Sequence, residues 1–179
     1  MIIVLNGPLG VGKSTLAEAL TESIDRCAML SGDHLVAVNP PPQNELEHLH
    51  STIVLLVHHY RRLGYQNFVV EHVWRTEGEL ADLKRRLDDT NVYCYLLTVS
   101  IEENLRRIER RQAARAIDER EFEHLTLAEE RRALEQPGLG TPFDVSAPPA
   151  ELVLRLLAAV GQGLTAWPSA AGRDERGGL

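Results

Sequence analysis

Lysine, cysteine and long hydrophobic runs are all scarce in this chain of 179 residues. Only two of its 19 basic residues are lysines, so a lysine inside a motif carries more weight than it would in a lysine-rich chain. The two cysteines, Cys27 and Cys94, each lie in an apolar run, which favours buried free thiols in a reducing compartment. The apolar run at 2–5 is too short for a signal peptide, and no run is long enough to span a membrane. We therefore expect a cytoplasmic protein without a membrane partner.

A basic excess is also absent. The net charge is −7, which argues against general binding to long nucleic acids. The hydrophobic fraction of 44% and the charged fraction of 25% are typical of an ordinary globular protein. The length fits one domain, which we place at 1–164, and we expect the Gly-, Ala- and charge-rich segment 165–179 to be a mobile tail. Composition leaves a monomer and a homodimer equally open.

Short apolar runs alternate with longer stretches of helical periodicity along the chain. The runs predict strands at 2–5, 27–30, 68–70, 92–99 and 143–145. The periodic stretches predict helices at 13–24, 45–63, 77–89, 101–116, 127–135 and 148–160. Thr76, Ser100 and Thr126 each precede a glutamate by three residues, which is the spacing of a capping box at a helix start. This alternation predicts an α/β fold, in which helices cover both faces of a parallel sheet.

The clearest motif is the segment Gly-Pro-Leu-Gly-Val-Gly-Lys-Ser at 7–14, which matches the phosphate-loop pattern G-x-x-x-x-G-K-[ST]. Glycines allow consecutive backbone N–H groups to face a phosphate, and the N-terminus of the following helix adds a partial positive charge. We expect Lys13 to reach the β- and γ-phosphates of ATP, and the Ser14 hydroxyl to bind Mg²⁺. The expected nucleotide-binding residues are Gly7, Leu9, Gly10, Val11, Gly12, Lys13, Ser14 and Thr15. The alternative is a glycine turn with a surface lysine, and the strand before the motif and the helix after it count against that.

Two carboxylates follow predicted strands and should reach the same edge of the sheet, because the carboxyl ends of parallel strands gather there. Asp33 follows the second strand and is either a helix N-cap or a catalytic group that handles a substrate. Glu71 ends the third strand and either holds a metal ion or its water, engages the substrate, or is simply exposed to solvent. Histidines of the helix at 45–63 lack the spacing and companion ligands of a metal site, so we interpret them as structural or substrate-lining.

An arginine-rich helix follows the fourth predicted strand. Its arginines are Arg106, Arg107, Arg110, Arg111 and Arg115. Arg107, Arg111 and Arg115 lie at successive spacings of four residues and therefore share one helix face. Arginine clamps stabilise charge on a phosphoryl group during its transfer. The alternative is a solvated basic face that pairs with neighbouring glutamates such as Glu103 and Glu109.

With these residues in this order, the chain resembles the small P-loop metabolite kinases, which include shikimate kinases, gluconate kinases and chloramphenicol phosphotransferase-like proteins. Its opening at 1–7 also resembles that of tunicamycin-resistance-type ATP-binding proteins. The resemblance covers roughly 1–160. It implies a P-loop NTPase three-layer sandwich, in which a five-stranded parallel sheet of order 2-3-1-4-5 carries helices on both faces.

The resemblance also implies roles for individual residues. In that family the acid after strand two activates or orients the acceptor hydroxyl, and it corresponds to Asp33. A mobile lid, here about 106–135, supplies arginines that correspond to Arg107 and Arg111 and, less directly, to Arg115. The loop before the last helix holds the adenine, and it corresponds to Asp144, Val145 and Ser146.

Two departures from the family limit what the resemblance implies. Glu71 stands where the family usually has aspartate, which leaves the metal geometry open. The helix at 45–63 carries no clear substrate motif, so the acceptor stays unidentified.

We expect an enzyme that uses ATP and Mg²⁺ to phosphorylate a hydroxyl of a small-molecule acceptor. Asp33 would be the base, Lys13 and the lid arginines would stabilise charge, and Ser14, with Glu71, would hold the metal. One alternative is an ATP-binding switch or resistance protein that transfers no phosphate. Another is a nucleotide or polynucleotide-end kinase.

Overall fold

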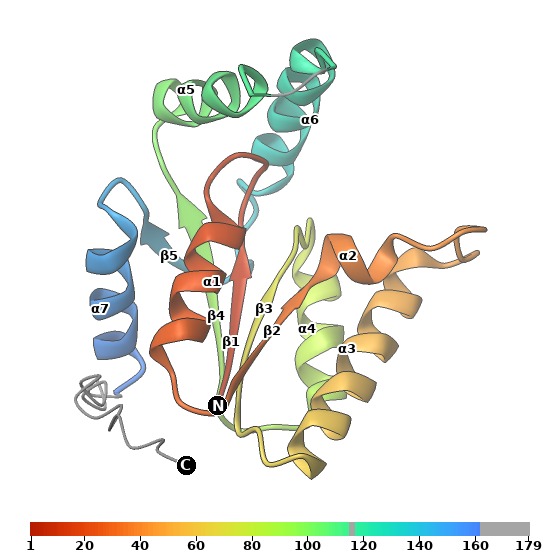
Figure 1. Cartoon of the computed structure of the whole chain (residues 1–179). Helices are drawn as coiled ribbons and strands as arrows, with labels where there is room; N and C mark the ends of the chain where they lie inside the picture. The colour runs from red at the N-terminus through yellow and green to blue at the C-terminus, as the bar shows by residue number, and fades with distance from the viewer. Residues whose placement is uncertain (115–116, 162–179) are drawn as a thin grey trace, which may run out of the picture.

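Five parallel strands form a sheet at the centre of the molecule (Figure 1). The computed structural model describes residues 1–114 and 117–161. Its strands are β1 (Ile2–Asn6), β2 (Cys27–Ser31), β3 (Asn67–Glu71), β4 (Val92–Thr98) and β5 (Thr141–Asp144). They pair in parallel in the spatial order β2-β3-β1-β4-β5, which confirms the expected α/β class and strand order. Arg115 and the expected tail at 165–179 lie outside the described residues.

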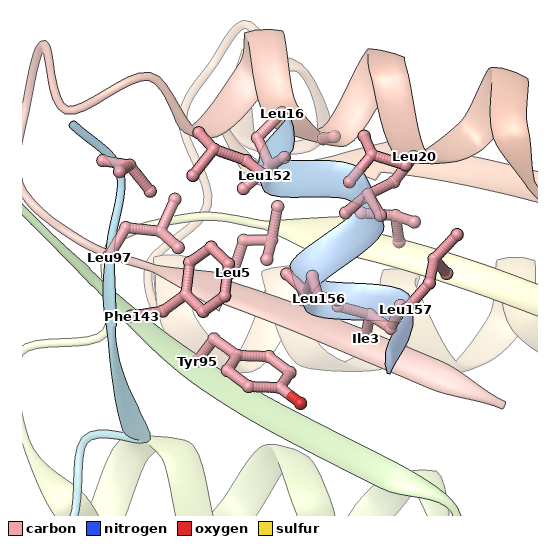
Figure 2. Close-up of a cluster of buried hydrophobic side chains, with 14 of the residues drawn as sticks. Ile3, Leu5, Leu16, Leu20, Tyr95, Leu97, Phe143, Leu152, Leu156 and Leu157 are labelled. Carbon is pink, nitrogen blue, oxygen red and sulfur yellow. The ribbon is translucent and has the colours of Figure 1, made fainter. Parts of the chain in front are cut away.

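The central strand β1 supplies apolar side chains to both faces of the sheet, because successive residues of a strand point to opposite sides. Ile3 and Leu5 face the side covered by α1 (Lys13–Ser23) and α7 (Pro149–Ala159). Figure 2 shows how leucines of both helices interdigitate there with aromatic residues of the sheet: Leu16, Leu20, Leu152, Leu156, Leu157, Tyr95 and Phe143. Each buried leucine stabilises the fold by about 1.5–3 kcal/mol. This core holds the start of α1, and with it the phosphate loop, against the sheet.

Ile2 and Val4 face the opposite side of the sheet, which α3 (Glu45–Arg62) and α4 (Glu77–Leu87) cover. The capping box expected at the start of α4 is confirmed: the Thr76 hydroxyl accepts from the N–H of Glu79, whose carboxylate accepts from the N–H of Thr76. A short helix, α2 (Gly32–Val36), follows β2 at the carboxyl edge of the sheet. None of the helices in the described residues is long and apolar enough to cross a membrane.

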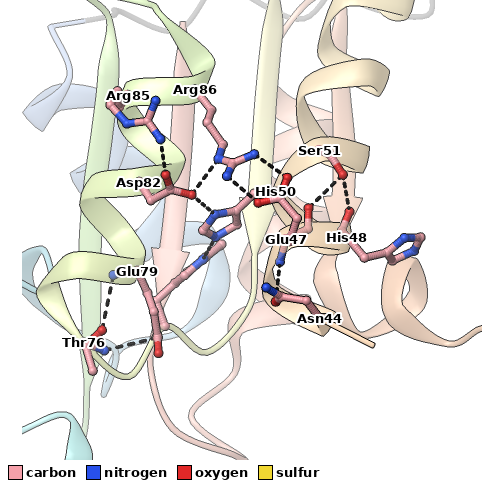
Figure 3. A network of polar contacts seen from close by, with 11 residues as sticks. Asn44, Glu47, His48, His50, Ser51, Thr76, Glu79, Asp82, Arg85 and Arg86 are labelled. Carbon is pink, nitrogen blue, oxygen red and sulfur yellow. Dashed lines mark hydrogen bonds and ion pairs between the residues drawn. The ribbon is translucent and has the colours of Figure 1, made fainter. Parts of the chain in front are cut away.

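A polar network joins α3 to α4 (Figure 3). His50 is completely buried; its Nε2 accepts from Trp74 Nε1 at 3.0 Å, and its Nδ1 lies 2.9 Å from Asp82 Oδ2. Arg86 then bridges Asp82 and Glu47. The expected structural role of histidines on this helix therefore holds for His50, which fixes Trp74 beneath the carboxyl edge of the sheet.

Two helices, α5 (Ile101–Gln112) and α6 (Arg120–Ala133), project beyond that edge as a separate pair (Figure 1). The expected boundaries were partly wrong: α5 ends at Gln112, and α6 begins at Arg120, so Thr126 lies inside a helix and caps nothing. The inner face of α6 explains the error. Its buried residues are Glu123, Leu127 and Glu130, so two charged side chains stand where an apolar periodicity would have revealed the helix.

Candidate functional site

The loop at 7–12 connects β1 to α1 and turns through backbone conformations that favour glycine. Gly10 has φ of 75° and Gly12 has φ of 104°. A Cβ at Gly10 would lie 2.7 Å from Ile108 Cγ1 and 2.9 Å from Asn104 Nδ2, so no side chain fits there. The turn thus favours glycine at both positions, and the packing of α5 against the loop requires it at Gly10 as well.

Lys13 lies folded back over this loop. Only 8% of the residue is exposed, and its Nζ donates to the backbone oxygens of Gly7 at 2.9 Å and Pro8 at 3.2 Å. Burial lowers the pKa of Lys13, and the nearby carboxylates of Glu130, Glu71 and Asp33 oppose that shift. The ammonium group therefore lies on the loop itself, and its contact with the phosphates of ATP stays a prediction.

Asn6 also positions the loop, and sequence reasoning missed it. The side chain is fully buried at the end of β1. Its Oδ1 accepts from the N–H groups of Gly7 at 2.9 Å and Trp74 at 3.0 Å, and its Nδ2 donates to the oxygens of Trp74 and Leu139. The sequence did offer one signal for Asn6, because it is a polar residue at the end of an otherwise apolar strand. Asn6 fastens the loop to the segments that follow β3 and precede β5.

Asp33 and Glu71 lie at the carboxyl ends of neighbouring strands, as predicted. Asp33 is in the first turn of α2 with 72% of its side chain exposed, and its Oδ1 lies 3.1 Å from His72 Nδ1. This hydrogen bond with His72 is the main cause that lowers the pKa of Asp33. The N-cap of α2 is Ser31, so the capping alternative for Asp33 is wrong.

Glu71, in contrast, is 1% exposed, which excludes the solvent-exposed alternative. Its Oε1 accepts a hydrogen bond from the Ser31 hydroxyl on the adjacent strand. Its Oε2 is buried and has no hydrogen-bond partner among the groups that the structure describes. A buried carboxylate oxygen without a partner is costly, and a cation or a cation-bound water would satisfy it.

One cavity of about 690 Å³ brings most of the predicted residues together. Its lining includes these predicted residues: Leu9, Gly10, Val11, Gly12, Lys13, Ser14, Thr15, Asp33, Glu71, Arg107, Arg111, Val145 and Ser146. Gly7 and Asp144 are predicted residues that do not line it. Instead, the Asp144 carboxylate accepts from the N–H and hydroxyl of Ser146 and shapes the loop after β5.

The predicted lid arginines make different contacts. Arg107 donates to the backbone oxygens of Val11 at 2.7 Å and Val145 at 2.9 Å, so it ties the phosphate loop to the loop after β5. Arg111 forms an ion pair with Glu123 of α6 and lies near enough to Lys13 to contribute to its lowered pKa. The roles that we assigned to both arginines in phosphoryl transfer remain predictions.

Two residues of the projecting helices hold the loop at Leu9, and sequence reasoning missed both. Asn104 Nδ2 of α5 donates to the Leu9 oxygen at 2.8 Å. The Leu9 N–H donates to Glu130 Oε2 of α6 at 2.6 Å. Glu130 is 121 residues from Leu9 along the chain, and no local pattern signals such a contact.

A family model described as an AAA domain matches residues 3–128. The chain belongs to the AAA domain family. No curated protein matches the sequence of this AAA-domain chain significantly.

Solved structures of small P-loop proteins resemble this AAA-domain chain over nearly their whole length. One is the tunicamycin resistance protein of Deinococcus radiodurans, with 18% identity and a TM-score of 0.66. The match covers 91% of this chain and 96% of the chain of that protein. A gluconokinase of Sinorhizobium meliloti 1021 has 21% identity, a TM-score of 0.64 and coverage of 89% and 90%. The shikimate kinase of Bacteroides thetaiotaomicron has 15% identity, a TM-score of 0.56 and coverage of 90% and 98%. The chain therefore has the P-loop nucleotide-binding fold of the small kinases, which confirms the resemblance noted from its motifs.

Proposed function

We propose that this protein is a kinase that transfers the γ-phosphoryl group of ATP to a hydroxyl of a small molecule. The observation that carries the proposal is the single cavity in which the phosphate loop, Lys13 and two carboxylates converge. A nucleotide-binding site needs only the loop and its lysine. Asp33 and Glu71 beside them are the kinds of group that transfer to a hydroxyl requires in addition.

The chemistry joins the acceptor oxygen to the γ-phosphorus and breaks the bond from that phosphorus to the β–γ bridging oxygen, so that ADP leaves. Asp33 takes the proton of the acceptor hydroxyl as the new bond forms. The hydrogen bond with His72 holds the pKa of Asp33 below its usual range, so the carboxylate is ionised at neutral pH, as a base must be. Lys13 stabilises the negative charge of the β- and γ-phosphates.

Ser14 and Glu71 are the residues that would hold Mg²⁺, which supplies neutralising charge to the β- and γ-phosphate oxygens. The unpartnered Oε2 of Glu71 supports this fit. In the part of the chain that the structure describes, no group of three His, Cys, Asp or Glu residues is arranged to hold a metal. This suits Mg²⁺, which proteins often hold through one or two side chains together with the phosphates of the substrate.

The remaining lining residues divide between the two substrates. Val145 and Ser146 follow β5, and Val145 is linked to the phosphate loop by Arg107. We assign this end of the cavity to the adenine. Arg107 joins the two loops that border it, through the backbone oxygens of Val11 and Val145. Arg111, on the same helix, is assigned to the transferring phosphoryl group, and its ion pair with Glu123 would have to open for that contact.

A ligand screen is the first test, because the acceptor has no sequence signature. Thermal unfolding would be followed with Mg²⁺, a non-hydrolysable ATP analogue and, in turn, sugars, sugar acids, cyclic hydroxy acids and nucleosides. We expect one class to stabilise the protein further only when the analogue is present. Without any such class, and without ADP formation from ATP, the protein would be the ATP-binding switch or resistance protein instead. Selection of nucleosides would name the acceptor class, and stabilisation by nucleotides in the same assay would instead make the protein a nucleotide kinase.

The second test isolates the base. Asp33→Asn should lower kcat by about 10²–10⁴ while ATP affinity is kept, because the phosphate loop is untouched. Asp25→Asn is the matched control, since the Asp25 side chain is 83% exposed. A kcat of Asp33→Asn within a factor of a few of the control would show that Asp33 is not the base. Joint loss of ATP binding and melting temperature would make its role structural.

A further inference from the structure

A carboxylate of the protein itself lies on the phosphate loop. Glu130 Oε2 accepts from the N–H of Leu9 at 2.6 Å, and the residue is only 6% exposed. Its Oε1 is 3.9 Å from Arg75 Nη2, just beyond the end of β3. Loop N–H groups of this kind bind anions. Glu130 therefore supplies an anion of the protein itself at this N–H group.

Leu9, the residue that Glu130 binds, lines the cavity of the site together with Lys13. In this motif the lysine reaches the β- and γ-phosphates. The Glu130 carboxylate therefore occupies an N–H group of the same loop residue, Leu9, that borders the cavity beside Lys13.

Helices α5 and α6 are each attached to Leu9 by one hydrogen bond. Asn104 of α5 holds the oxygen of Leu9, whereas Glu130 of α6 holds its N–H group. Displacement of the Glu130 carboxylate therefore frees α6 from the loop and leaves the contact of α5 in place. It also separates Glu130 from Arg75, a residue of the segment that follows β3.

We infer that Glu130 is a specificity-determining residue that discriminates nucleotides by their terminal phosphate. The γ-phosphate of a nucleoside triphosphate competes with the Glu130 carboxylate for the Leu9 N–H group and displaces it, which moves α6. A diphosphate lacks that group and leaves Glu130 largely in place. This inference rests on the proposed nucleotide-binding function and adds to it a sensor that reports the γ-phosphate to the lid.

The test is the ratio of two affinities. Binding of a non-hydrolysable ATP analogue and of ADP, each with Mg²⁺, would be measured by calorimetry for the wild type, Glu130→Gln and Glu129→Gln. Glu129 is the matched control because it is adjacent on α6 and exposed. Glu130→Gln keeps the shape and an oxygen acceptor but removes the competing charge. We expect it to tighten the triphosphate by about tenfold, the difference between a charged and a neutral hydrogen-bond partner, and to change ADP much less.

Each outcome decides the matter. An unchanged ratio in Glu130→Gln, or equal tightening of both nucleotides, would overturn the sensor role, and weaker triphosphate binding would make Glu130 a ligand of the nucleotide. Absence of binding in the wild type and in Glu129→Gln would overturn the nucleotide-binding function itself, which is a different result. If Glu130→Gln fails to fold, Glu130→Ala is expected to shift the ratio in the same direction. A purely structural role would lower the melting temperature and leave the ratio unchanged.

Discussion

Replacement of Asn6 by alanine should destabilise the protein by about 4 kcal/mol. The side chain is completely buried and satisfies four backbone groups, which are the N–H groups of Gly7 and Trp74 and the oxygens of Trp74 and Leu139. An unsatisfied buried polar group costs about 1–3 kcal/mol, so four of them at the lower bound give about 4 kcal/mol. For a protein of this size the melting temperature should fall by about 8–16 °C.

The assay is urea unfolding, followed by calorimetry of ATP binding at a temperature where the variant remains folded. ATP affinity should fall as well, because Asn6 holds the first residue of the phosphate loop. Asn91→Ala is the matched control: Asn91 is exposed, and its replacement should change stability by less than about 0.5 kcal/mol. A loss below about 1 kcal/mol for Asn6→Ala would refute the argument that its hydrogen bonds support the loop.

The remaining predictions concern the loop and one thiol. Gly10→Ala should cost about 3 kcal/mol in urea titrations, because its methyl would lie 2.7 Å from a side-chain carbon of α5. Gly64→Ala, also at positive φ but with nothing within 4 Å, should cost only about 1 kcal/mol, and equal losses would contradict the packing argument. Lys13→Ala should lower turnover by about 10²–10³. Replacement of the only other lysine, Lys84, should leave the kinetics unchanged. ATP affinity and turnover equal to those of the wild type in Lys13→Ala would disprove the role of the motif. Burial raises the pKa of Cys27 to about 11 from an ordinary 9.0, so the folded state holds this proton more tightly than the unfolded state. The stabilising contribution of this thiol is complete below pH 9 and is lost as the pH rises through about 11. The free energy of unfolding of the wild type should therefore fall more steeply in this range than that of Cys27→Ala. Parallel curves of unfolding free energy against pH for the two proteins would exclude this effect.

The sequence predicted well the elements that are buried through apolar residues, and less well the helix that is buried through charged residues. The buried strands and the helices at 13–24 and 45–63 were placed within one or two residues, because continuous apolar runs and apolar helical periodicity reflect burial directly. The start of α6 was missed because its inner face carries Glu123 and Glu130. Charged residues signal a buried face only once their partners are known. Arg111 binds Glu123 and Leu9 binds Glu130, and both of these partners lie outside α6.

By itself, the sequence determined the phosphate loop, the α/β fold and the edge of the sheet where Asp33 and Glu71 meet. These features follow from local rules, since glycine spacing sets the turn and the parallel arrangement collects the strand ends. Only the tertiary structure decided that Arg107 holds backbone oxygens of two loops and that Glu130 lies on the phosphate loop. It also decided that one buried oxygen of Glu71 has no hydrogen-bond partner within 1–114 and 117–161. Each of these facts depends on the distance between segments that are remote in the sequence, and the packing of α5, α6 and the strands sets that distance.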